Sequence, residues 1–593
     1  MLLRLATRPF PPFRSATALF HARTLVSSSR PALRASHRAR VGLITGAVLA
    51  TSLLAGNVTS PIHADAEQSD NLRSESARPQ TPLSALVRSY IVYSICSVPA
   101  IVDWSPTILS VLFSLPGIRQ IAQAVVRVTF FDQFVGADSA EDAIPLLEQL
   151  RAENKGCLFA YSVEVDEDEA SGTAKDDKHA KLSTHKQIIT ETLHCIDVAA
   201  DFENKYSSHH GSDMRGRKTW VAVKMSAMLP RTEALVHFSK YLVSTRPKSS
   251  PSVAFPGRPL SSDFDVLSSR SATNSFLTDS DIADLRELRD DLREICKRAR
   301  EHGVKIIVDA EYSWYQPAID AFTLSLQREF NRLPSSSWFR LGNPTLHTSA
   351  VQPLVYQTYQ AYLRRTPEYL KQSLAAARAE GYSLGVKLVR GAYHPHEMAA
   401  HASAMSTRTS TSTLISSYGY SQSISPDPAP PVWSTKDETD TCYNACATLL
   451  LEHLRADIKA ARADGSPRLG ILFGTHNWNS CELILSELAK LGLASVTGAT
   501  TWVPETVTER VAIGQLYGMS DALTDSLVSR TRCASPFVMK YIPYGNLAEV
   551  MPYLSRRAIE NKSVLGNGGA ADERRRAGSE IRKRIASWSG LSW

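Results

Sequence analysis

Two arginines and a glutamate lie within about one helical turn of each other near the end of the chain, in the stretch MKYIPYGNLAEVMPYLSRRAIEN. A helix would place the head groups of Arg556, Arg557 and Glu560 on neighbouring ridges. Asn546, with Glu549 three residues later, predicts where this helix begins. Two planar guanidiniums can hold one small carboxylate through bidentate hydrogen bonds. The alternative is a solvated helix face whose ion pair contributes only ~0.3 to 0.5 kcal/mol.

Other polar residues stand at the ends of short apolar runs earlier in the chain. They are Lys224, Asp309 with Glu311, Gln357, Lys387, Thr475 with His476 and Asn477, and Tyr541. A single polar residue at the end of a strand is usually a satisfied structural group. Several that converge indicate a binding or catalytic site instead. Whether they meet depends on the fold that carries them.

Eight short runs rich in β-branched and aromatic residues carry these side chains. They are LFAYSVEV from Leu158, WVAVKM from Trp220, KIIVDAE from Lys305, LVYQTY from Leu354, GVKLVRG from Gly385, GILFGTHN from Gly470, VAIGQLYG from Val511 and FVMKYI from Phe537. Segments with the apolar spacing of helices alternate with them, which predicts parallel strands buried on both faces. Eight such units predict an α/β fold, a (β/α)8 TIM-like barrel with its active site where the strands end. An open doubly wound sheet is the competitor, but no G-x-G-x-x-G follows any run.

The barrel is expected to span residues 155–566, after an N-terminal helical region at 65–154. Stretches rich in Ser, Thr and Pro at 244–279 and 401–432 have too little apolar content to pack, so they are expected to be flexible excursions from loops. Residues 567–593 form a basic tail, predicted to be either an amphipathic helix on anionic lipid or an exposed capping helix.

The composition is typical of a soluble globular enzyme, with 593 residues, 43% hydrophobic and 21% charged. The formal charge of +7 comes from residues 1–64, which hold eight arginines and no Asp, Glu or Lys, whereas the rest has 58 basic and 59 acidic residues. This balance gives no support for nucleic-acid binding. Eight cysteines are scattered without the spacing of a zinc site, so no metal is expected, and their use fits a reducing compartment.

The first 64 residues resemble a mitochondrial presequence, because Arg, Ser and Ala recur and the first acidic residue is Asp65. A disordered basic arm is the alternative. Within this segment, Val41–Gly56 is apolar but marginal against the roughly 20 residues of a membrane-spanning helix. It is expected to be a membrane anchor, a second sorting signal or a remnant of a cleaved leader.

Six motifs, in this order, resemble the proline dehydrogenase family. They are VKMSAML around Lys224, IIVDAEYSWYQPAID around Asp309, KLVRGAYHPHE from Lys387, FGTHNWNS around His476, GQLYGMSDALT around Met519, and the block from Tyr541 to Asn561. The resemblance implies a distorted (β/α)8 barrel that holds FAD, oxidises L-proline to (S)-1-pyrroline-5-carboxylate and passes electrons to a membrane quinone, ubiquinone. It also implies a mitochondrial enzyme at the matrix side of the inner membrane.

On the substrate side, the resemblance assigns Lys224, Asp309, Tyr541, Arg556, Arg557 and Glu560. The two arginines would bind the carboxylate of proline, Lys224 would add a third positive charge, and Glu560 would orient the arginines. Tyr541, with Leu523 or another apolar neighbour, would cover the ring. Asp309 would orient Tyr541 or Lys224. The protein would mainly supply orientation and electrostatics.

On the cofactor side, the resemblance assigns Gln357, Lys387, Val389, Gly391, Tyr393, Glu397, Lys436, Thr475, His476 and Asn477. Lys387 or Lys436 would stabilise the reduced, anionic flavin, and Glu397 would reach the ribityl or ribose. Many bacterial relatives carry R-L-V-K-G-A-Y where this chain has K-L-V-R-G-A-Y, with the cations Lys387 and Arg390 exchanged.

The residues alone also allow other functions. His394 and His396, beside Glu397, form an H-P-H motif of the kind that metal-dependent barrel hydrolases use, although four residues separate it from the strand end. A buried lysine at Lys224 or Lys387 would suit a Schiff-base lyase. A scaffold without catalysis would leave the strand-end polar groups unexplained. Within the family, a 4-hydroxyproline dehydrogenase would carry nearly the same motifs.

Overall fold

The computed structural model describes residues 81–162, 178–207, 214, 216–247, 251–268, 276–334, 351–409, 423–460, 467–561 and 569–589. The chain divides into two units, Met1–Gln80 and Thr81–Trp593, and the described residues belong to the second. The predicted presequence and the apolar segment Val41–Gly56 therefore lie outside the described residues.

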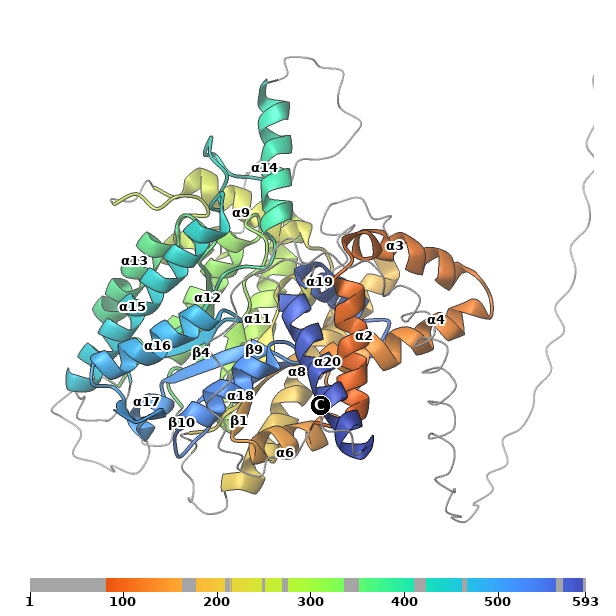
Figure 1. Ribbon diagram of the computed structural model, residues 1–593. Coiled ribbons are helices and arrows are strands. Elements are labelled where there is room, and N and C mark those ends of the chain that lie inside the picture. The colour runs from red at the N-terminus through yellow and green to blue at the C-terminus, as the bar shows by residue number, and fades with distance from the viewer. Residues whose placement is uncertain are drawn as a thin grey trace, which may run out of the picture. The chain divides into compact units, whose positions relative to one another are not determined.

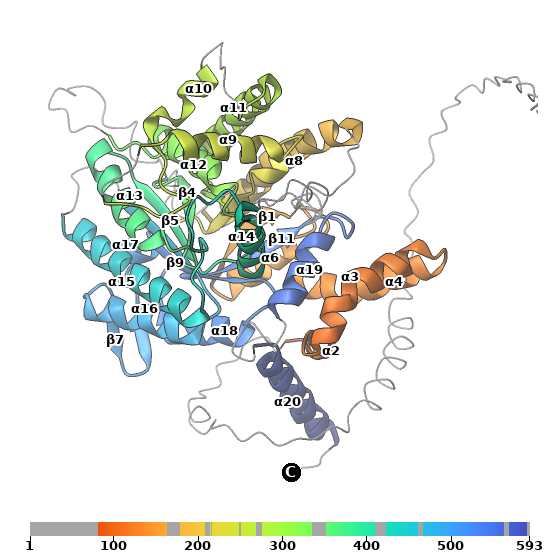
Figure 2. The same ribbon diagram turned by 90° about the horizontal axis from the view of Figure 1, so that it is seen from above.

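Eight parallel strands close into a barrel in the order β1-β11-β9-β6-β5-β4-β3-β2 (Figures 1 and 2). The strands are β1 (Lys155–Tyr161), β2 (Thr219–Val223), β3 (Ile306–Val308), β4 (Val355–Gln360), β5 (Leu384–Val389), β6 (Leu469–Gly474), β9 (Val511–Leu516) and β11 (Val538–Tyr544). All eight predicted strands are present, and the predicted (β/α)8 barrel is confirmed. Because every pairing in the ring is parallel, all the carboxyl ends open at one mouth.

Successive side chains of a strand point to opposite faces, so the side chains of the barrel strands lie in two apolar environments. Trp220, Tyr356 and Met539 belong to a buried cluster formed by strand residues alone, which fills the inside of the barrel. Their sequence neighbours Val221 and Val355 belong to another cluster, which includes residues of the surrounding helices. Both faces of these strands are buried, and this explains why the runs are continuously apolar.

A helix follows each strand of the barrel, and these helices surround it (Figure 1). They are α8 (Lys178–Ser207), α9 (Glu233–Thr245), α12 (Gln316–Phe330), α13 (Thr366–Glu380), α15 (Lys436–Ala460), α16 (Trp478–Lys490), α18 (Asp521–Arg530) and α19 (Met551–Glu560). Shorter or additional elements are η2 (Ser226–Met228), η3 (Ser261–Phe264), α10 (Asp265–Ser268), α11 (Asp279–His302), α14 (His394–Thr409) and α17 (Glu505–Thr508). The long helix α11 starts at a capping box formed by Thr278 and Asp281 and ends at Gly303, whose φ is 64°.

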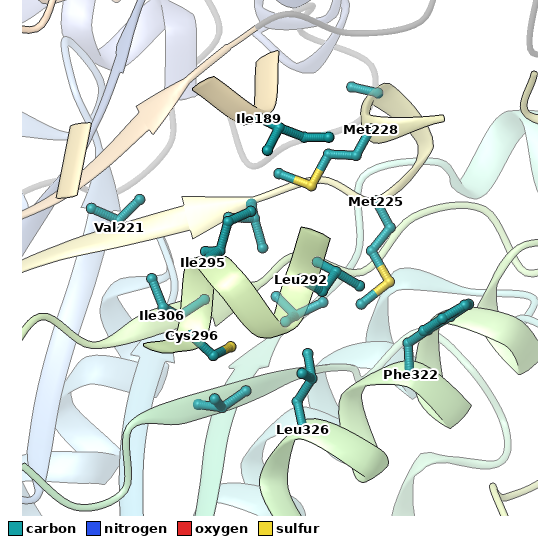
Figure 3. Close-up of a cluster of buried hydrophobic side chains, with 14 of the residues drawn as sticks. Ile189, Val221, Met225, Met228, Leu292, Ile295, Cys296, Ile306, Phe322 and Leu326 are labelled. Atoms are coloured by element: carbon teal, nitrogen blue, oxygen red, sulfur yellow. The ribbon is translucent and has the colours of Figure 1, made fainter. Parts of the chain in front are cut away.

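Helices α8, α11 and α12 pack on β2 and β3 through one large apolar cluster (Figure 3). Ile189 of α8, Ile295 of α11 and Phe322 of α12 are all buried there, next to Val221 and Ile306 of the two strands. Burying one such side chain contributes about 1.5 to 3 kcal/mol to folding. This side of the barrel therefore forms a rigid support for the residues that follow β2 and β3.

The two ends of the described chain lie side by side. The segments before the barrel are α2 (Leu83–Cys96), α3 (Pro99–Ser114), α4 (Ile118–Val126), η1 (Arg127–Phe131), α5 (Asp132–Phe134) and α6 (Ile144–Ala152). The tail forms α20 (Gly569–Ser589), which packs against α2 (Figure 1). Gly578 of α20 abuts the ring of Tyr90, and Arg584 Nη1 donates a hydrogen bond of 2.6 Å to the carbonyl of Thr81. The described part of the tail is thus a helix packed on α2.

Among the described residues, no single helix is both long and apolar enough to cross a membrane; α2 and Pro99–Ser105 pass that test only as a pair, bent by 88°.

Both Ser-, Thr- and Pro-rich stretches pack in part, and their residues 248–250, 269–275 and 410–422 lie outside the described residues. In 244–279, Phe255 and Leu267 are buried, and in 401–432, Val432 is buried. A few apolar side chains are enough to attach a loop to an existing core, even where its average composition is polar. A small sheet of β7 (Ser495–Thr497), β8 (Thr500–Trp502) and β10 (Thr531–Arg532) was not predicted, because its strands are too short for an apolar pattern.

Helix α19 begins later than the sequence predicts. Its first residue is Met551 and its N-cap is Val550. Asn546 and Glu549 do form the two reciprocal hydrogen bonds of a capping box, each 3.3 Å long, but these bonds close a turn ahead of the helix. Pro552 explains the late start, because proline lacks an amide hydrogen and fits only the first turn of a helix.

The loop after β9 packs closely against the helical region that precedes the barrel. Gly518 has a φ of +70°, and a Cβ there would clash with the carbonyl oxygen of Gln133. Gly492 also has a φ of +70°, but a Cβ there would meet nothing within 4 Å. We expect Gly492→Ala to cost about 1 kcal/mol of stability through backbone strain alone, and Gly518→Ala to cost clearly more. Equal shifts of the thermal unfolding midpoint in the two variants would contradict this packing.

Candidate active site

A cavity of about 620 Å³ lies at the carboxyl ends of the strands. All eight barrel strands, or the residues that directly follow them, contribute to its lining. It brings together all but two of the predicted site residues: Lys224, Asp309, Lys387, Val389, Gly391, Tyr393, Lys436, Thr475, His476, Asn477, Tyr541, Arg556, Arg557 and Glu560. The exceptions are Gln357 and Glu397.

Asp309 connects three strands across the mouth of the barrel. Its Oδ1 accepts a hydrogen bond of 2.5 Å from Lys387 Nζ of β5, and its Oδ2 accepts one of 3.0 Å from the hydroxyl of Tyr541 of β11. The Lys387 ammonium also lies 5.1 Å from the centre of the Tyr541 ring. Both partners of the ion pair are nearly buried, so the low local dielectric strengthens the contact. Asp309 orients Tyr541, as the sequence predicted, but its cationic partner is Lys387.

The arginines of α19 differ in their surroundings. Arg557 is buried, and its Nη2 donates a hydrogen bond of 2.6 Å to Glu560 Oε1. Its Nε is buried without a hydrogen-bond partner among the described residues. Arg556 is partly buried, and its Nη1 donates to the hydroxyl of Tyr393 at 3.2 Å. The arginines therefore line a cavity, which rules out the solvated-face alternative for this helix.

Arg390 organises the wall formed by β5, β6 and α16. Its guanidinium donates to Asp440 Oδ1 at 2.6 Å, to Thr475 Oγ1 at 2.7 Å and to Ser480 Oγ at 2.8 Å. Asn477 is the N-cap of α16, since its Oδ1 accepts a bond of 3.0 Å from the amide of Ser480. The positive end of this 13-residue helix thus faces the cavity. The K-L-V-R motif was recognised in the sequence, but Arg390 itself was not predicted as a site residue.

His476 is held as a neutral ring. Burial, followed by the charges of Lys540 and Arg557, lowers the pKa of His476 to about 3. Its Nε2 faces the amide of Leu516 at 3.4 Å and its Nδ1 lies 3.0 Å from Ser520 Oγ. The amide can only donate, so the proton is on Nδ1 and is donated to the serine. The ring is therefore uncharged at neutral pH.

Gln357 lies on the outer side of β4, which corrects its prediction as a cavity residue. Its side-chain amide donates to Asp320 Oδ1 at 2.8 Å and to the hydroxyl of Tyr369 at 2.7 Å. Gln360, three residues later, has the opposite parity and lines the cavity. Its Oε1 is buried without a partner among the described residues. Both glutamines follow apolar residues of the same strand, so the local sequence does not distinguish them. Only the orientation of β4 in the barrel decides which one faces the cavity.

Glu397 also lies outside the cavity. It accepts hydrogen bonds of 2.6 Å from the amide and 2.5 Å from the hydroxyl of Ser313, and so ties α14 to the loop after β3. Burial raises the pKa of Glu397 to about 7, against these two donors, which lower it. The neighbouring Tyr393 packs on Tyr312, with ring centres 4.2 Å apart. Glu397 therefore positions the wall that carries Tyr393.

The helices at the two ends of the described chain complete the cavity. Tyr93 of α2 lines it and donates a hydrogen bond of 2.6 Å to the carbonyl of Gly518. Asp572 and Glu573 of α20 line it as well, and burial raises the pKa of Glu573. The sequence signal for these residues is weak, since they lie far from the motifs. Leu523, the predicted cover for a substrate ring, is buried and does not line the cavity. Leu516 lines the cavity instead.

Comparison with known proteins agrees with this geometry. The sequence profile of the family described as "Proline dehydrogenase" matches residues 159–567. The match covers more than half of the chain. The chain belongs to the proline dehydrogenase family. This is an oxidoreductase family, and the resemblance found in the motifs is confirmed.

Individual relatives match most of the chain. The chain is 26% identical to human "Proline dehydrogenase 1, mitochondrial", with 84% of this chain and 87% of that protein covered. It is 27% identical to rat "Hydroxyproline dehydrogenase", with 84% and 91% covered. A structure of proline utilization A from Bdellovibrio bacteriovorus aligns with 18% identity and a TM-score of 0.48, over 82% of this chain and 37% of that chain. This member of the family thus spans little more than a third of the Bdellovibrio protein.

The histidines of the H-P-H motif have separate partners. His394 Nε2 lies 2.8 Å from the carbonyl of Trp433, and the ring of His396 packs edge-on against Tyr312. Within the described part of the chain, no group of three or more His, Cys, Asp or Glu residues is arranged to hold a metal ion. The side chains at this motif thus form no ligand set of the kind that a barrel hydrolase uses.

The cavity of this proline dehydrogenase family member is suited to an anionic ligand. Its cationic residues are Lys224, Lys387, Arg390, Lys436, Arg556 and Arg557. Several are paired with carboxylates, for example Lys436 with Asp440 at 2.5 Å, and this pairing holds their head groups in place. Guanidiniums of this kind still have donors available for carboxylate or phosphate oxygens.

Glu397 predicts a pH dependence of stability. Its pKa is raised in the folded state, so its contribution to stability is complete below about pH 4.5 and is lost as the pH rises through about 7. Glu397→Gln does not titrate, so we expect the thermal midpoint of the unchanged protein to fall relative to this variant between about pH 5 and 8. Glu301→Gln, at an exposed position of α11, serves as the control and should follow the unchanged protein. A difference that stays constant with pH would contradict the burial of Glu397.

Proposed function

We propose that this protein is an FAD-dependent proline dehydrogenase of mitochondria. It oxidises L-proline to (S)-1-pyrroline-5-carboxylate and passes the electrons to a membrane quinone, ubiquinone, at the matrix side of the inner membrane. The observation that carries the proposal is the meeting of Arg556 and Arg557 with the Asp309, Lys387 and Tyr541 group in one cavity. The name of the human relative supports the compartment.

The residues of the cavity fit FAD. A cavity of about 620 Å³ lies within the size range of small-molecule and cofactor sites. Buried polar atoms without partners among the described residues, Gln360 Oε1 and Arg557 Nε, belong to residues that line it, and a ligand would satisfy them. The residues that would hold the cofactor are Gln360, Lys387, Val389, Arg390, Gly391, Tyr393, Lys436, Thr475, His476 and Asn477. Gln360 and Arg390 line the cavity, whereas Gln357 and Glu397 lie outside it in supporting positions.

The substrate side follows from charge and shape. The carboxylate of proline would bind Arg556 and Arg557, whose forks match its two oxygens. Glu560 fixes the orientation of Arg557, and Lys224 adds positive charge at the same cavity. Tyr541, held by Asp309, offers a flat surface to the pyrrolidine ring. The neutral His476 lines the cavity without adding further positive charge.

The protein's part in the reaction is orientation and electrostatics. Oxidation of the ring removes a hydride from the carbon next to nitrogen and a proton from the nitrogen. A bound flavin supplies the two-electron acceptor. The clamp on the carboxylate and the surface of Tyr541 would hold that carbon in one place, and such positioning can account for a large part of the rate. The Lys387 and Asp309 pair keeps a fixed cation in the cavity, where it stabilises negative charge.

A 4-hydroxyproline dehydrogenase is the second candidate function, because the chain is 27% identical to the rat protein of that name. The two substrates share the carboxylate, the amine and the ring. The clamp on the carboxylate would hold both, so only the contacts of the ring can distinguish them.

We expect the purified protein to be yellow and its flavin absorption to bleach when L-proline is added without oxygen. Trans-4-hydroxyproline is the matched substrate, and the ratio of the two bleaching rates decides between the two candidate functions. L-pipecolate, with a larger ring, tests the fit of the pocket in the same assay. A colourless protein that binds no flavin and contains stoichiometric zinc would overturn the proposal in favour of a hydrolase.

We expect Arg556→Met to raise the KM for proline at least about tenfold, which corresponds to about 1.4 kcal/mol, because a charged pair with the carboxylate is lost. Arg556→Lys keeps the charge but not the fork, so it should give a smaller increase. Arg575→Met removes an arginine of α20 whose side chain is 73% exposed, and it should leave the KM unchanged. An unchanged KM in Arg556→Met would show that α19 does not bind the carboxylate.

A further inference from the structure

Helices α3 and α4 expose a continuous row of apolar side chains. We call this row the apolar stripe; its members are Val98, Ile101, Trp104, Ile108, Val111, Leu115, Ile118, Ile121, Val125 and Val128. Successive members are three or four residues apart, so they follow one side of each helix. Each is 39% to 66% exposed, and Trp104 is 64% exposed. Single exposed apolar residues are ordinary, but a continuous row of ten marks an interaction surface.

The helical hairpin formed by α3 and α4 carries few polar groups. Asp103 and Arg119 are the only charged residues of α3 and α4. Ser105 and Ser114 donate hydrogen bonds of 2.8 and 2.7 Å to the carbonyls of Val102 and Val111 in their own helix. A hydroxyl that is hydrogen-bonded within its own helix needs no partner from the solvent, so it can enter an apolar medium without losing a hydrogen bond.

The geometry points to a lipid bilayer as the partner of the apolar stripe. We propose that α3 and α4 lie in the interfacial plane of a membrane and insert the stripe among the acyl chains, as amphipathic helices do. An interface with a second protein would need about one hydrogen bond per 100 to 200 Å². The stripe offers apolar surface with almost no charge, so a bilayer suits it better than a second copy of this chain.

The position of the hairpin relates this docking to the cavity. α3 packs against α19, which carries Arg556 and Arg557, and it follows α2, whose Tyr93 lines the cavity (Figures 1 and 2). Docking through the stripe would therefore bring the cavity wall close to the membrane surface. This consequence rests on the proposed function, because it would place a membrane-dissolved quinone near the site where electrons leave the substrate.

The basic helix α20 is less suited to this role. Three of its five arginines have acidic partners close by: Arg575 pairs with Asp572, Arg576 lies 3.5 Å from Glu573 and Asp525, and Arg584 lies 3.0 Å from Glu580. Binding through α20 would depend on anionic lipid and would weaken at high salt. Binding through the stripe should depend on neither.

The test is binding of the full-length protein to vesicles, measured by co-flotation. We expect binding to phosphatidylcholine vesicles that is similar with and without phosphatidylserine and similar at about 0.1 M and about 1 M salt. The double variant Trp104→Gln with Ile108→Gln should bind at least about tenfold more weakly, since it removes two side chains from the acyl region. Both positions are exposed, so thermal unfolding and flavin content should be unchanged.

The matched control is Trp502→Gln with Val496→Gln, on the small sheet of β7 and β8. These side chains are 54% and 57% exposed but lie outside the stripe, so the control should bind vesicles like the unchanged protein. Equal vesicle binding by the stripe variant and the unchanged protein would overturn the proposal. So would binding that requires phosphatidylserine or disappears at high salt, which would indicate α20. A dimer that the stripe variant dissociates, without vesicle binding by the unchanged protein, would indicate a second copy as the partner.

Failure of this inference and failure of the proposed function give different results. With a soluble dye as electron acceptor, the stripe variant should oxidise proline as fast as the unchanged protein. With ubiquinone in phosphatidylcholine vesicles, it should be slower by about the factor lost in vesicle binding. If the unchanged protein binds vesicles but oxidises proline with neither acceptor, the proposed function fails and the docking surface stands.

Discussion

Parallel closure of the eight strands is the constraint on which the rest of the site depends. In a closed parallel ring, residues at the ends of strands that are not neighbours face each other across the mouth. Asp309, Lys387 and Tyr541 are joined in this way, although 78 and 232 residues of sequence separate Asp309 from its two partners. Their hydrogen bonds exist only because the barrel is closed. Their geometry in turn determines which surface a ring in the cavity would meet.

Several cationic side chains lie at the mouth of the barrel, and carboxylates hold their head groups in fixed positions. Asp309 holds Lys387, Glu560 holds Arg557, and Asp440 holds both Arg390 and Lys436. A partly buried cation without such a partner would be costly, so the pairs make the cluster tolerable. Burial keeps His476 neutral within this field, so the cavity is suited to anionic groups without a further cation.

The helices at the ends of the described chain belong to the site as much as the barrel does. Tyr93 of α2 and Glu573 of α20 line the same cavity, and the two helices pack side by side. α3 continues from α2, contacts α19 and exposes the apolar stripe on its outer side. One run of helices therefore extends from the cavity wall to an outer surface that is suited to lipid. This continuity gives a physical reason why a chemical site at the barrel mouth and a docking surface lie close together.

The sequence determined the strands and most of the site by itself. Short apolar runs that alternate with helical segments indicate strands buried on both faces, and polar residues at the ends of such strands are expected at the mouth of a barrel. The barrel and residues such as Lys387 and Asp309 were therefore predictable. Only the tertiary structure decided which face of a strand each side chain occupies and which residues it contacts. Gln357 and Gln360 are the same residue three positions apart on one strand, and only the orientation of β4 puts Gln360 in the cavity. Likewise, the packing of α2 and α20 joins residues with no local sequence signal, because contacts between distant segments are set by the closed fold and not by any short pattern.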